Sequence, residues 1–242
     1  MIRPNLLLGL FAFFASADSG SCGIITQWTF ETNPPADLDN STSISGIAAD
    51  TGTGLASGLH ASGATDWSTP LGNGSANSLS ANNWLINDYF QFSSSTSGFN
   101  NIMLNWSQTS SATGPRDFKL AYQINGGAFS DFQSYSVSAN SGTWSAGTPI
   151  NTDVRAFDLS SVLGLNNATT VSFRLIDTST VSANGATVSA VGTDRVDNFT
   201  INGTLTAVPE PASLAFLSSL ILAGAIRARC RKKRSSVEHV CA

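Results

Sequence analysis

The chain has 242 residues and a formal net charge of −4, but its charges are unevenly distributed. Residues 18 to 208 carry fourteen Asp and Glu against five Lys and Arg, a net charge of −9, so this region does not match a nucleic-acid-binding protein. Cys22 is the only cysteine in that region, because Cys230 and Cys241 lie near the C-terminus. Without a second cysteine the region has no internal disulfide, and a packed core must stabilise it.

The N-terminus has the three parts of a secretory signal peptide. Arg3 is followed by an apolar run from Leu6 to Ala15, and Ala15-Ser16-Ala17 supplies small residues for cleavage. A lipoprotein anchor on Cys22 is an alternative, but the three small residues before it lack the apolar residue that such a site needs. We therefore assign residues 1–17 to a signal peptide helix.

The following region, residues 18–207, has the composition of a β-protein. Ser, Thr, Asn and Gly are abundant, and large apolar residues alternate with polar ones. The segment from Asp37 to Asn82 favours long loops joined by short strands. Asp153 to Leu165 predicts a short strand and a helical turn capped by Asp158 or Ser160. Period-two stripes predict six strands, at Ile24 to Phe30, Asp88 to Phe92, Asn101 to Gln108, Asp117 to Ile124, Thr170 to Asp177 and Arg195 to Thr206.

A hairpin is the strongest local prediction. Asn125-Gly126-Gly127 tolerates positive φ and joins the predicted strand Asp117 to Ile124 to a partner at Phe129 to Val137. Seven to ten strands with loops of this length indicate one all-β domain, a two-sheet sandwich of jelly-roll type. A β-propeller or solenoid fits less well because no repeat of fixed period is visible.

Few residues in this domain have catalytic chemistry. His60 is its only histidine and lies in a Gly-rich stretch, which predicts a surface loop rather than a zinc site or a catalytic base. Asp194 and Asp197 are the obvious pair of carboxylates for a glycosidase. Alternation places them on opposite faces of a strand, with Asp197 on the side of Phe199. There it would need an ion-pair partner, which Arg195 on the same side or Arg116 in another loop could provide.

Two kinds of binding site follow from the same residues and their neighbours. An ion pair or turn cap is the simplest role for the carboxylates, and a calcium site formed by Asp194, Asp197 or Asn198 is an alternative. No other cofactor is expected. Sugar rings stack on indole faces, so tryptophans in Gly-, Ser- and Asn-rich segments are candidate glycan contacts, although core or loop packing is their simpler role. These candidates are Trp67, Trp84 and Trp144.

The C-terminus predicts a membrane anchor. Fifteen uncharged, mostly apolar residues from Ala212 to Ile226 would span about 22 Å as a helix, short of the bilayer core at about 30 Å unless the flanking arginines snorkel. The following basic cluster marks the cytoplasmic side. It consists of Arg227, Arg229, Arg231, Lys232, Lys233 and Arg234. Pro209 and Pro211 fix an extended segment in front of the helix.

Val208-Pro209-Glu210-Pro211, the apolar helix and the basic cluster together resemble the PEP-CTERM sorting signal of Gram-negative bacteria that make exopolysaccharide. The resemblance implies that exosortase, a membrane-embedded protease-transpeptidase, recognises the Pro-Glu-Pro segment, removes the tail and passes the protein to the surface or matrix. Residues 208–234 would be this signal and residues 235–242 a cytoplasmic extension, which family members usually lack. Stretches around Trp106 to Leu120 and Gly192 to Phe199 resemble a secreted β-sandwich module that often carries this signal.

The sequence therefore predicts an exported surface or matrix protein without enzymatic activity. Its expected partners are exosortase, the membrane before processing, and extracellular polysaccharide. A secreted polysaccharide hydrolase with Asp194 or Asp197 as a catalytic carboxylate is the alternative.

Overall fold

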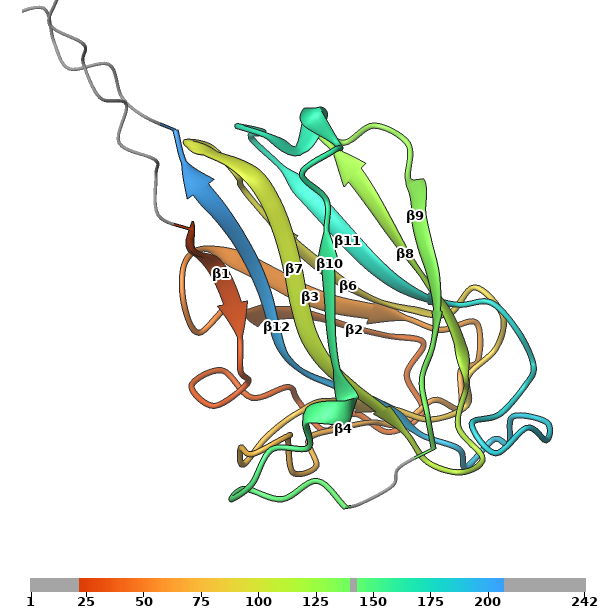
Figure 1. Ribbon diagram of the computed structural model, residues 1–242. Helices are drawn as coiled ribbons and strands as arrows, with labels where there is room; N and C mark the ends of the chain where they lie inside the picture. Colours follow the sequence, from red (N-terminus) through yellow and green to blue (C-terminus); the bar gives the residue numbers. More distant parts are fainter. Residues whose placement is uncertain (1–21, 140–142, 207–242) are drawn as a thin grey trace, which may run out of the picture. The chain divides into compact units, whose positions relative to one another are not determined.

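A computed structural model of the chain describes residues 22–139 and 143–206, which form two antiparallel sheets of six strands each. Sheet A has the order β10 (Val154–Asp158), β7 (Phe99–Ser110), β12 (Asp194–Leu205), β5 (Leu79–Ala81) and β4 (Trp67–Ser68), with β1 (Cys22–Trp28) also paired to β12. Sheet B has the order β2 (Ser43–Ala48), β3 (Gly54–Leu59), β6 (Tyr89–Ser94), β11 (Val171–Asp177), β8 (Asp117–Ile124) and β9 (Ser130–Ser136). Figure 1 shows β7 lying between β10 and β12.

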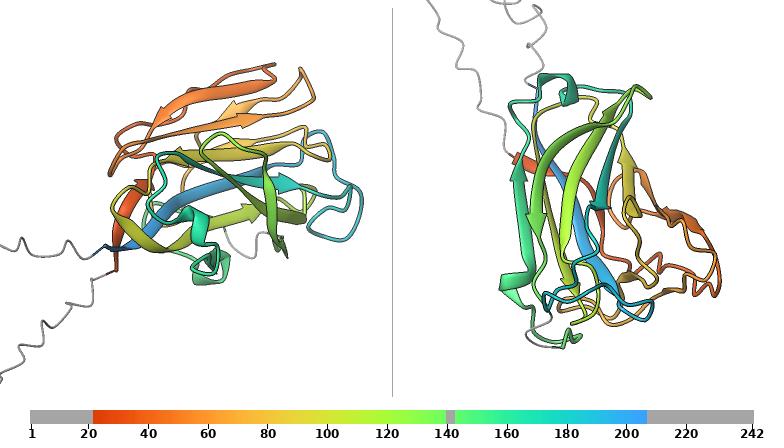
Figure 2. Two further views of the ribbon diagram at one scale, coloured as in Figure 1. Left: turned by 90° about the horizontal axis from the view of Figure 1, so that it is seen from above. Right: turned by 90° about the vertical axis from the view of Figure 1, so that its right-hand side faces the viewer.

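The two sheets face one another across an aromatic core. Phe92 of sheet B stacks on Phe199 of sheet A with 3.8 Å between ring centroids, and Trp28 meets both rings edge-on at 5.3 and 6.0 Å. The predicted stripes of β6, β7, β8 and β11 all supply buried residues to this core. The all-β prediction with two sheets is therefore confirmed. In both views of Figure 2, β2 and β3 lie at one margin of the molecule, where β2 is an edge strand.

The predicted hairpin joins β8 to β9. Asn125 and Gly126 have φ values of 49° and 73°, so both central residues take the left-handed conformation that a tight hairpin turn requires. Gly127 N–H donates to the Ile124 carbonyl at 2.9 Å and closes the turn. The Asn-Gly pair was therefore sufficient to locate this connection.

Two strand ends differ from the prediction. β1 stops at Trp28 because Asp50 Oδ2 accepts the backbone N–H groups of Thr29 and Phe30 at 2.7 and 2.8 Å, and Phe30 has a φ of 60°. At the other end, Leu205 is 57% exposed although the alternation placed it with Phe199 and Ile201. The register of β12 on β7 shifts between Asn202 and Thr204, which breaks the alternation.

A β-bulge in β12 decides where the two aspartates point. Asp197 pairs with Ser107 and Thr200 with Asn105, so Asn198 and Phe199 together oppose Trp106. Asn198 has a φ of 54°. Because the bulge inserts one residue, Phe199 faces the core and Asp197 faces the outer side of sheet A. The prediction that Asp197 shares the side of Phe199 was wrong for this reason.

The first and last described strands pair with one another at the ends of the described chain. Cys22 of β1 pairs with Thr204 of β12. The predicted signal peptide, the sorting motif, the apolar helix and the basic cluster all lie outside the described residues. Within residues 22–139 and 143–206, no helix has the length and apolar character needed to cross a bilayer.

Candidate functional site

Asp194 lies in a buried polar network on the core side of sheet A. Its side chain is fully buried, and Gln108 Nε2 donates to its Oδ1 at 2.9 Å. Gln108 Oε1 in turn accepts from Trp106 Nε1 at 3.0 Å and from the Tyr135 hydroxyl at 2.8 Å. Ser110 Oγ lies 2.8 Å from Asp194 Oδ2 and 2.6 Å from the Pro115 carbonyl. Each of these polar groups therefore has a partner.

The geometry indicates that Asp194 is protonated. The Pro115 carbonyl can only accept, so the single hydroxyl proton of Ser110 is directed to it. The contact between Ser110 and Asp194 then needs a proton from the carboxyl group. In agreement, burial raises the pKa of Asp194 well above its usual range. Asp194 is thus a buried hydrogen-bonding group of the core, and burial favours its neutral form.

Asp197, on the outer side of sheet A, ties distant segments together. Its Oδ2 accepts from Asn73 N, Ser75 Oγ and Asn198 Nδ2 at 2.8, 2.7 and 2.9 Å, and its Oδ1 accepts from Asn198 N at 2.6 Å. Burial raises its pKa to about 6 despite these donors. The ion-pair partner expected from the sequence is not used, because Arg195 instead donates to the Leu71 carbonyl.

These positions do not fit a calcium ion shared by Asp194 and Asp197, or a glycosidase that uses the two as a pair. Asp194 and Asp197 lie on opposite faces of β12, so they cannot share an ion or flank one sugar. Asn198 donates its side-chain amide to Asp197 rather than presenting an oxygen to a cation. Among the described residues, no three His, Cys, Asp or Glu side chains gather as metal ligands would. Both carboxylates accept hydrogen bonds from neutral groups of the fold, and among the described residues neither forms the ion pair that the simpler interpretation named.

The three candidate tryptophans are buried and cannot stack on a sugar. Trp67, Trp84 and Trp144 are at most 3% exposed. Their indole N–H groups donate within the protein, to the Ser41 carbonyl, the Ala81 carbonyl and Asp153 Oδ2 respectively. Their burial excludes the glycan-contact role, and Trp67 and Trp84 belong to the hydrophobic core instead.

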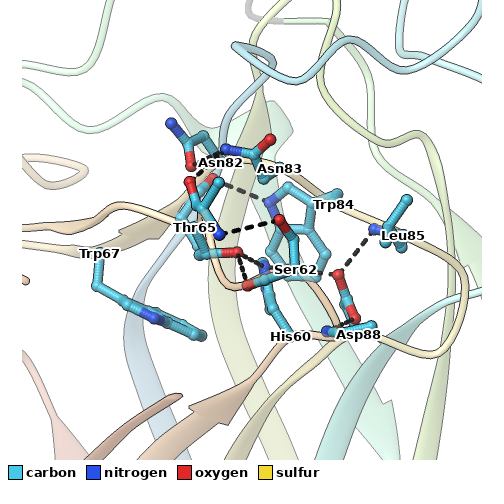
Figure 3. Close-up of polar contacts among 12 residues, drawn as sticks. His60, Ser62, Thr65, Trp67, Asn82, Asn83, Trp84, Leu85 and Asp88 are labelled. Carbon is cyan, nitrogen blue, oxygen red and sulfur yellow. Dashed lines mark hydrogen bonds and ion pairs between the residues drawn. The ribbon is translucent and has the colours of Figure 1, made fainter. Parts of the chain in front are cut away.

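His60 was also predicted wrongly, since it is 1% exposed rather than on a surface loop. Figure 3 shows it between the rings of Trp67 and Trp84, at centroid distances of 4.7 and 4.3 Å. His60 Nδ1 lies 3.2 Å from Thr65 Oγ1 and 3.5 Å from Asp88 Oδ2. Because the Thr65 hydroxyl donates its proton to the Ser62 carbonyl, its oxygen accepts the hydrogen bond that His60 Nδ1–H donates. Nε2 accepts no hydrogen bond from any residue that the structure describes.

We expect His60 to stay neutral throughout the physiological range. Burial lowers its pKa to about 3 and outweighs a backbone hydrogen bond with Asn82, which acts in the opposite direction. The Cε1–H NMR signal of His60 should therefore not shift between pH 8 and pH 5. The same signal in denaturant should titrate near the free value of about 6.5. A midpoint near 6.5 in the folded protein would contradict this burial.

An open aromatic surface lies on the outer face of sheet B. Alternation turns Tyr89, Gln91 and Arg174 away from the core, and register places Leu59 beside Tyr89 and Gln91 beside Arg174. Phe129, just before β9, folds over this face, and the Arg174 guanidinium carbon lies 3.9 Å from the ring centroids of both Phe129 and Tyr89. We call these five residues the Arg174 face.

The Arg174 face adjoins a shallow hollow of about 350 Å³. Leu59 lines the hollow together with Ile86, and both are nearly half exposed, at 45% and 47%. Neighbouring strands of sheet B thus present apolar surface, aromatic rings, an amide and a guanidinium group on one face. The signal in the sequence was the polar-side alternation in β6 and β11, but it did not show which residues would meet.

No protein-family model matches the chain, and no curated protein matches it in sequence. Solved structures with a partly similar shape include an endo-1,4-beta-D-xylanase 10B of Clostridium thermocellum bound to xylohexaose, with 14% identity over 78% of this chain and 30% of that one, at a TM-score of 0.41. A cleaved adhesin domain of Lys-gingipain from Porphyromonas gingivalis has 11% identity over 76% and 99%, at a TM-score of 0.39. TmCBM61, bound to beta-1,4-galactotriose, has 10% identity over 72% and 92%, at a TM-score of 0.31. At this level of similarity none of them assigns the chain a family, a ligand or an activity.

Proposed function

We propose that this chain is an exported, non-enzymatic protein of the cell surface or extracellular matrix, with a sandwich of jelly-roll type that contacts polysaccharide. The Arg174 face carries the contact part of the proposal. Polysaccharides present ring faces and hydroxyl groups, which suit exposed apolar and aromatic side chains interspersed with polar ones. Leu59, Tyr89 and Gln91 offer such groups on adjacent strands of sheet B.

The sorting part of the proposal is supported by the sequence of the tail. Val208-Pro209-Glu210-Pro211, the apolar stretch and the basic cluster have the order and spacing of the PEP-CTERM signal. Processing by exosortase would release the sandwich from an inner-membrane intermediate. Cys22 of β1 pairs with Thr204 of β12, so the two ends of the described sandwich lie side by side.

Mass spectrometry of the protein from the surface fraction of its host tests the sorting. The native product should end near Pro211, because the tail after the motif is removed. Alanine at Pro209, Glu210 and Pro211 should leave a membrane-bound form that still ends at Ala242. An intact C-terminus in both proteins would refute processing and leave a single-span membrane protein.

Co-sedimentation with the host's own extracellular polysaccharide tests the contact. The full chain should sediment with the polymer, and neither the length nor the reducing ends of the polymer should change on incubation. Release of new reducing ends would instead support the hydrolase alternative. No sedimentation would refute polysaccharide contact.

A further inference from the structure

Arg174 is set apart from the other basic residues of the sandwich by its surroundings. Arg116 pairs with Asp117, and Lys119 pairs with Asp131, with 2.9 and 3.0 Å between the charged atoms. Arg155 and Arg195 donate to backbone carbonyls. Within the described part of the chain, Arg174 makes no ion pair and no hydrogen bond to a backbone carbonyl, although acidic residues outnumber basic ones there. Its charge is therefore not used to stabilise the fold through a carboxylate.

The guanidinium group of Arg174 is nevertheless held in place. Its carbon lies 3.9 Å from the ring centroids of Tyr89 and Phe129, and its Nε donates to Gln91 Oε1 at 2.7 Å. Two ring contacts and one charge-assisted hydrogen bond fix a side chain that otherwise has several free rotamers. The side chain of Arg174 therefore loses its conformational entropy on folding, so that a ligand does not have to order it on binding.

The two terminal nitrogens of Arg174, Nη1 and Nη2, are available to a ligand. No described residue accepts a hydrogen bond from them. Three buried side-chain atoms of the described residues lack a partner, namely His60 Nε2, Thr109 Oγ1 and Asp177 Oδ2. Neither terminal nitrogen of Arg174 belongs to this group, so the two nitrogens are not buried. Since they are neither bonded nor buried, they contact solvent on the outer face of sheet B. Their fixed fork matches the two oxygens of a carboxylate.

The charges close to this fork favour an anion despite the acidity of the domain. At physiological ionic strength, charges more than about 8 Å away are largely screened. On the same face, Lys119 neutralises Asp131. Asp88 lines the neighbouring hollow but is itself buried, and desolvation raises its pKa. The backbone N–H groups of Ala61 and Leu85 donate to its two oxygens. Neither carboxylate forms an ion pair with Arg174, so the charge of the fork is open to an anion.

We propose that Arg174 is a preorganised receptor for a sugar carboxylate, so that the face selects polysaccharides that contain uronic acids. This inference rests on the proposed polysaccharide contact and adds the class of sugar. In the complex, Nη1 and Nη2 donate to the two carboxylate oxygens. The exposed edges of Tyr89 and Phe129, with Leu59 beside them, contact the sugar rings on either side.

Affinity measurements with two matched polymers test the selection. Polygalacturonate and the same polymer after chemical reduction of its carboxyl groups differ only in charge and the oxygens that Arg174 would bind. The full chain should bind polygalacturonate at least about tenfold more tightly than the reduced polymer, because hydrogen bonds to charged groups are the stronger ones. The preference should fall as salt is added.

Variants separate the arginine from general charge effects. Arg174→Gln should abolish the preference for polygalacturonate, and Arg174→Lys, which keeps the charge but not the fork, should restore only a small part of it. Arg155→Gln removes the same charge from β10 of the other sheet and should leave the preference unchanged. Thermal unfolding of each variant shows whether the fold is retained, and the comparison of polymers on the unaltered chain does not depend on any variant.

Each remaining outcome contradicts the inference in a recognisable way. Equal binding of both polymers would refute uronate selection and leave the proposed polysaccharide contact intact. A preference that persists in Arg174→Gln would place the selection elsewhere. Equally tight binding of poly-glutamate would show a receptor for acidic polypeptides. If the chain binds neither test polymer but still sediments with the host's polysaccharide, only the uronate class is refuted. If it binds neither test polymer and does not sediment with the host's polysaccharide, the proposed function is refuted as well.

Discussion

Replacement of Asp194 by alanine is expected to lower the free energy of unfolding by about 2–4 kcal/mol. The substitution leaves Gln108 Nε2 buried without an acceptor and opens a small cavity between the sheets. Ser110 would keep its bond to the Pro115 carbonyl, so the loss is concentrated at Gln108. Urea denaturation of the full chain and the variant at pH 5, followed by tryptophan fluorescence, measures this difference.

Asp194→Asn is the matched control, because an amide has the shape and the donor of a protonated carboxyl group. Its NH₂ group can donate to Ser110 while its oxygen accepts from Gln108. A carboxyl group whose pKa is raised in the fold stabilises the protein below its unfolded pKa of about 3.8, and this stability is lost as pH rises toward the folded pKa. The asparagine variant does not titrate, so its stability relative to the unaltered chain should increase from pH 4 to pH 8. If asparagine destabilises as strongly as alanine at both pH values, Asp194 is ionised.

Replacement of Asp197 by alanine should cost about 3 kcal/mol for a different reason. It removes one acceptor group that serves Asn73, Ser75 and both donors of Asn198, and so frees the loop that the carboxylate ties to β12. Amide hydrogen exchange should show the largest loss of protection at Asn73 and Asn198. Unchanged exchange there, together with unchanged stability, would show that the loop is held by other contacts.

Asparagine should not replace Asp197 as well as it replaces Asp194. Each group bonded to Asp197 donates to it, so the NH₂ group of an asparagine would replace an acceptor with a donor. It would then face the backbone N–H of Asn198, which is also a donor. We expect Asp197→Asn to lose about 1–2 kcal/mol, between the effects of no change and alanine. The same variant bears on the hydrolase alternative. Loss of polysaccharide cleavage without loss of stability would support catalysis, whereas lost stability with no cleavage by either form fits a structural carboxylate.

The pH dependence of Asp197 has the same sign as that of Asp194. Burial raises the pKa of Asp197 to about 6 and that of Asp177 to about 7, both above the value of 3.8 for a free aspartate. These groups therefore favour the folded state most at low pH, and their contribution declines between about pH 4 and pH 7. Asp50 and Asp117 act oppositely, because hydrogen bonds lower their pKa values and their contribution is lost in acid.

Local patterns in the sequence predicted the elements that depend on neighbouring residues. Alternation of Phe118, Leu120 and Tyr122 fixed one face of β8, since side chains in a strand alternate whatever the strand pairs with. Asn125-Gly126 fixed the hairpin because few residues adopt positive φ. The predicted signal peptide and sorting signal likewise depend on contiguous residues, and they stay predictions because they lie outside the described part of the chain.

Interactions between distant residues were not predictable in this way. Asp197 meets Asn73 from 124 positions away, and His60 lies against Trp84 because a Gly-rich segment folds inward over the core. One left-handed residue, Asn198, inserts a bulge that moves Asp197 to the other side of its strand. Its conformation is decided by pairing with β7, which a single strand does not encode.

The sequence by itself determined that the chain forms β-strands, which faces of most strands are apolar, and that its two ends have the features of export signals. Only the tertiary structure decided that three tryptophans and His60 are buried, that Asp194 and Asp197 serve the fold, and that Tyr89, Arg174 and Phe129 form one surface. The physical reason is that strand periodicity is a property of adjacent residues, whereas a binding surface on a sheet joins strands whose order and register arise from the packing of the whole domain.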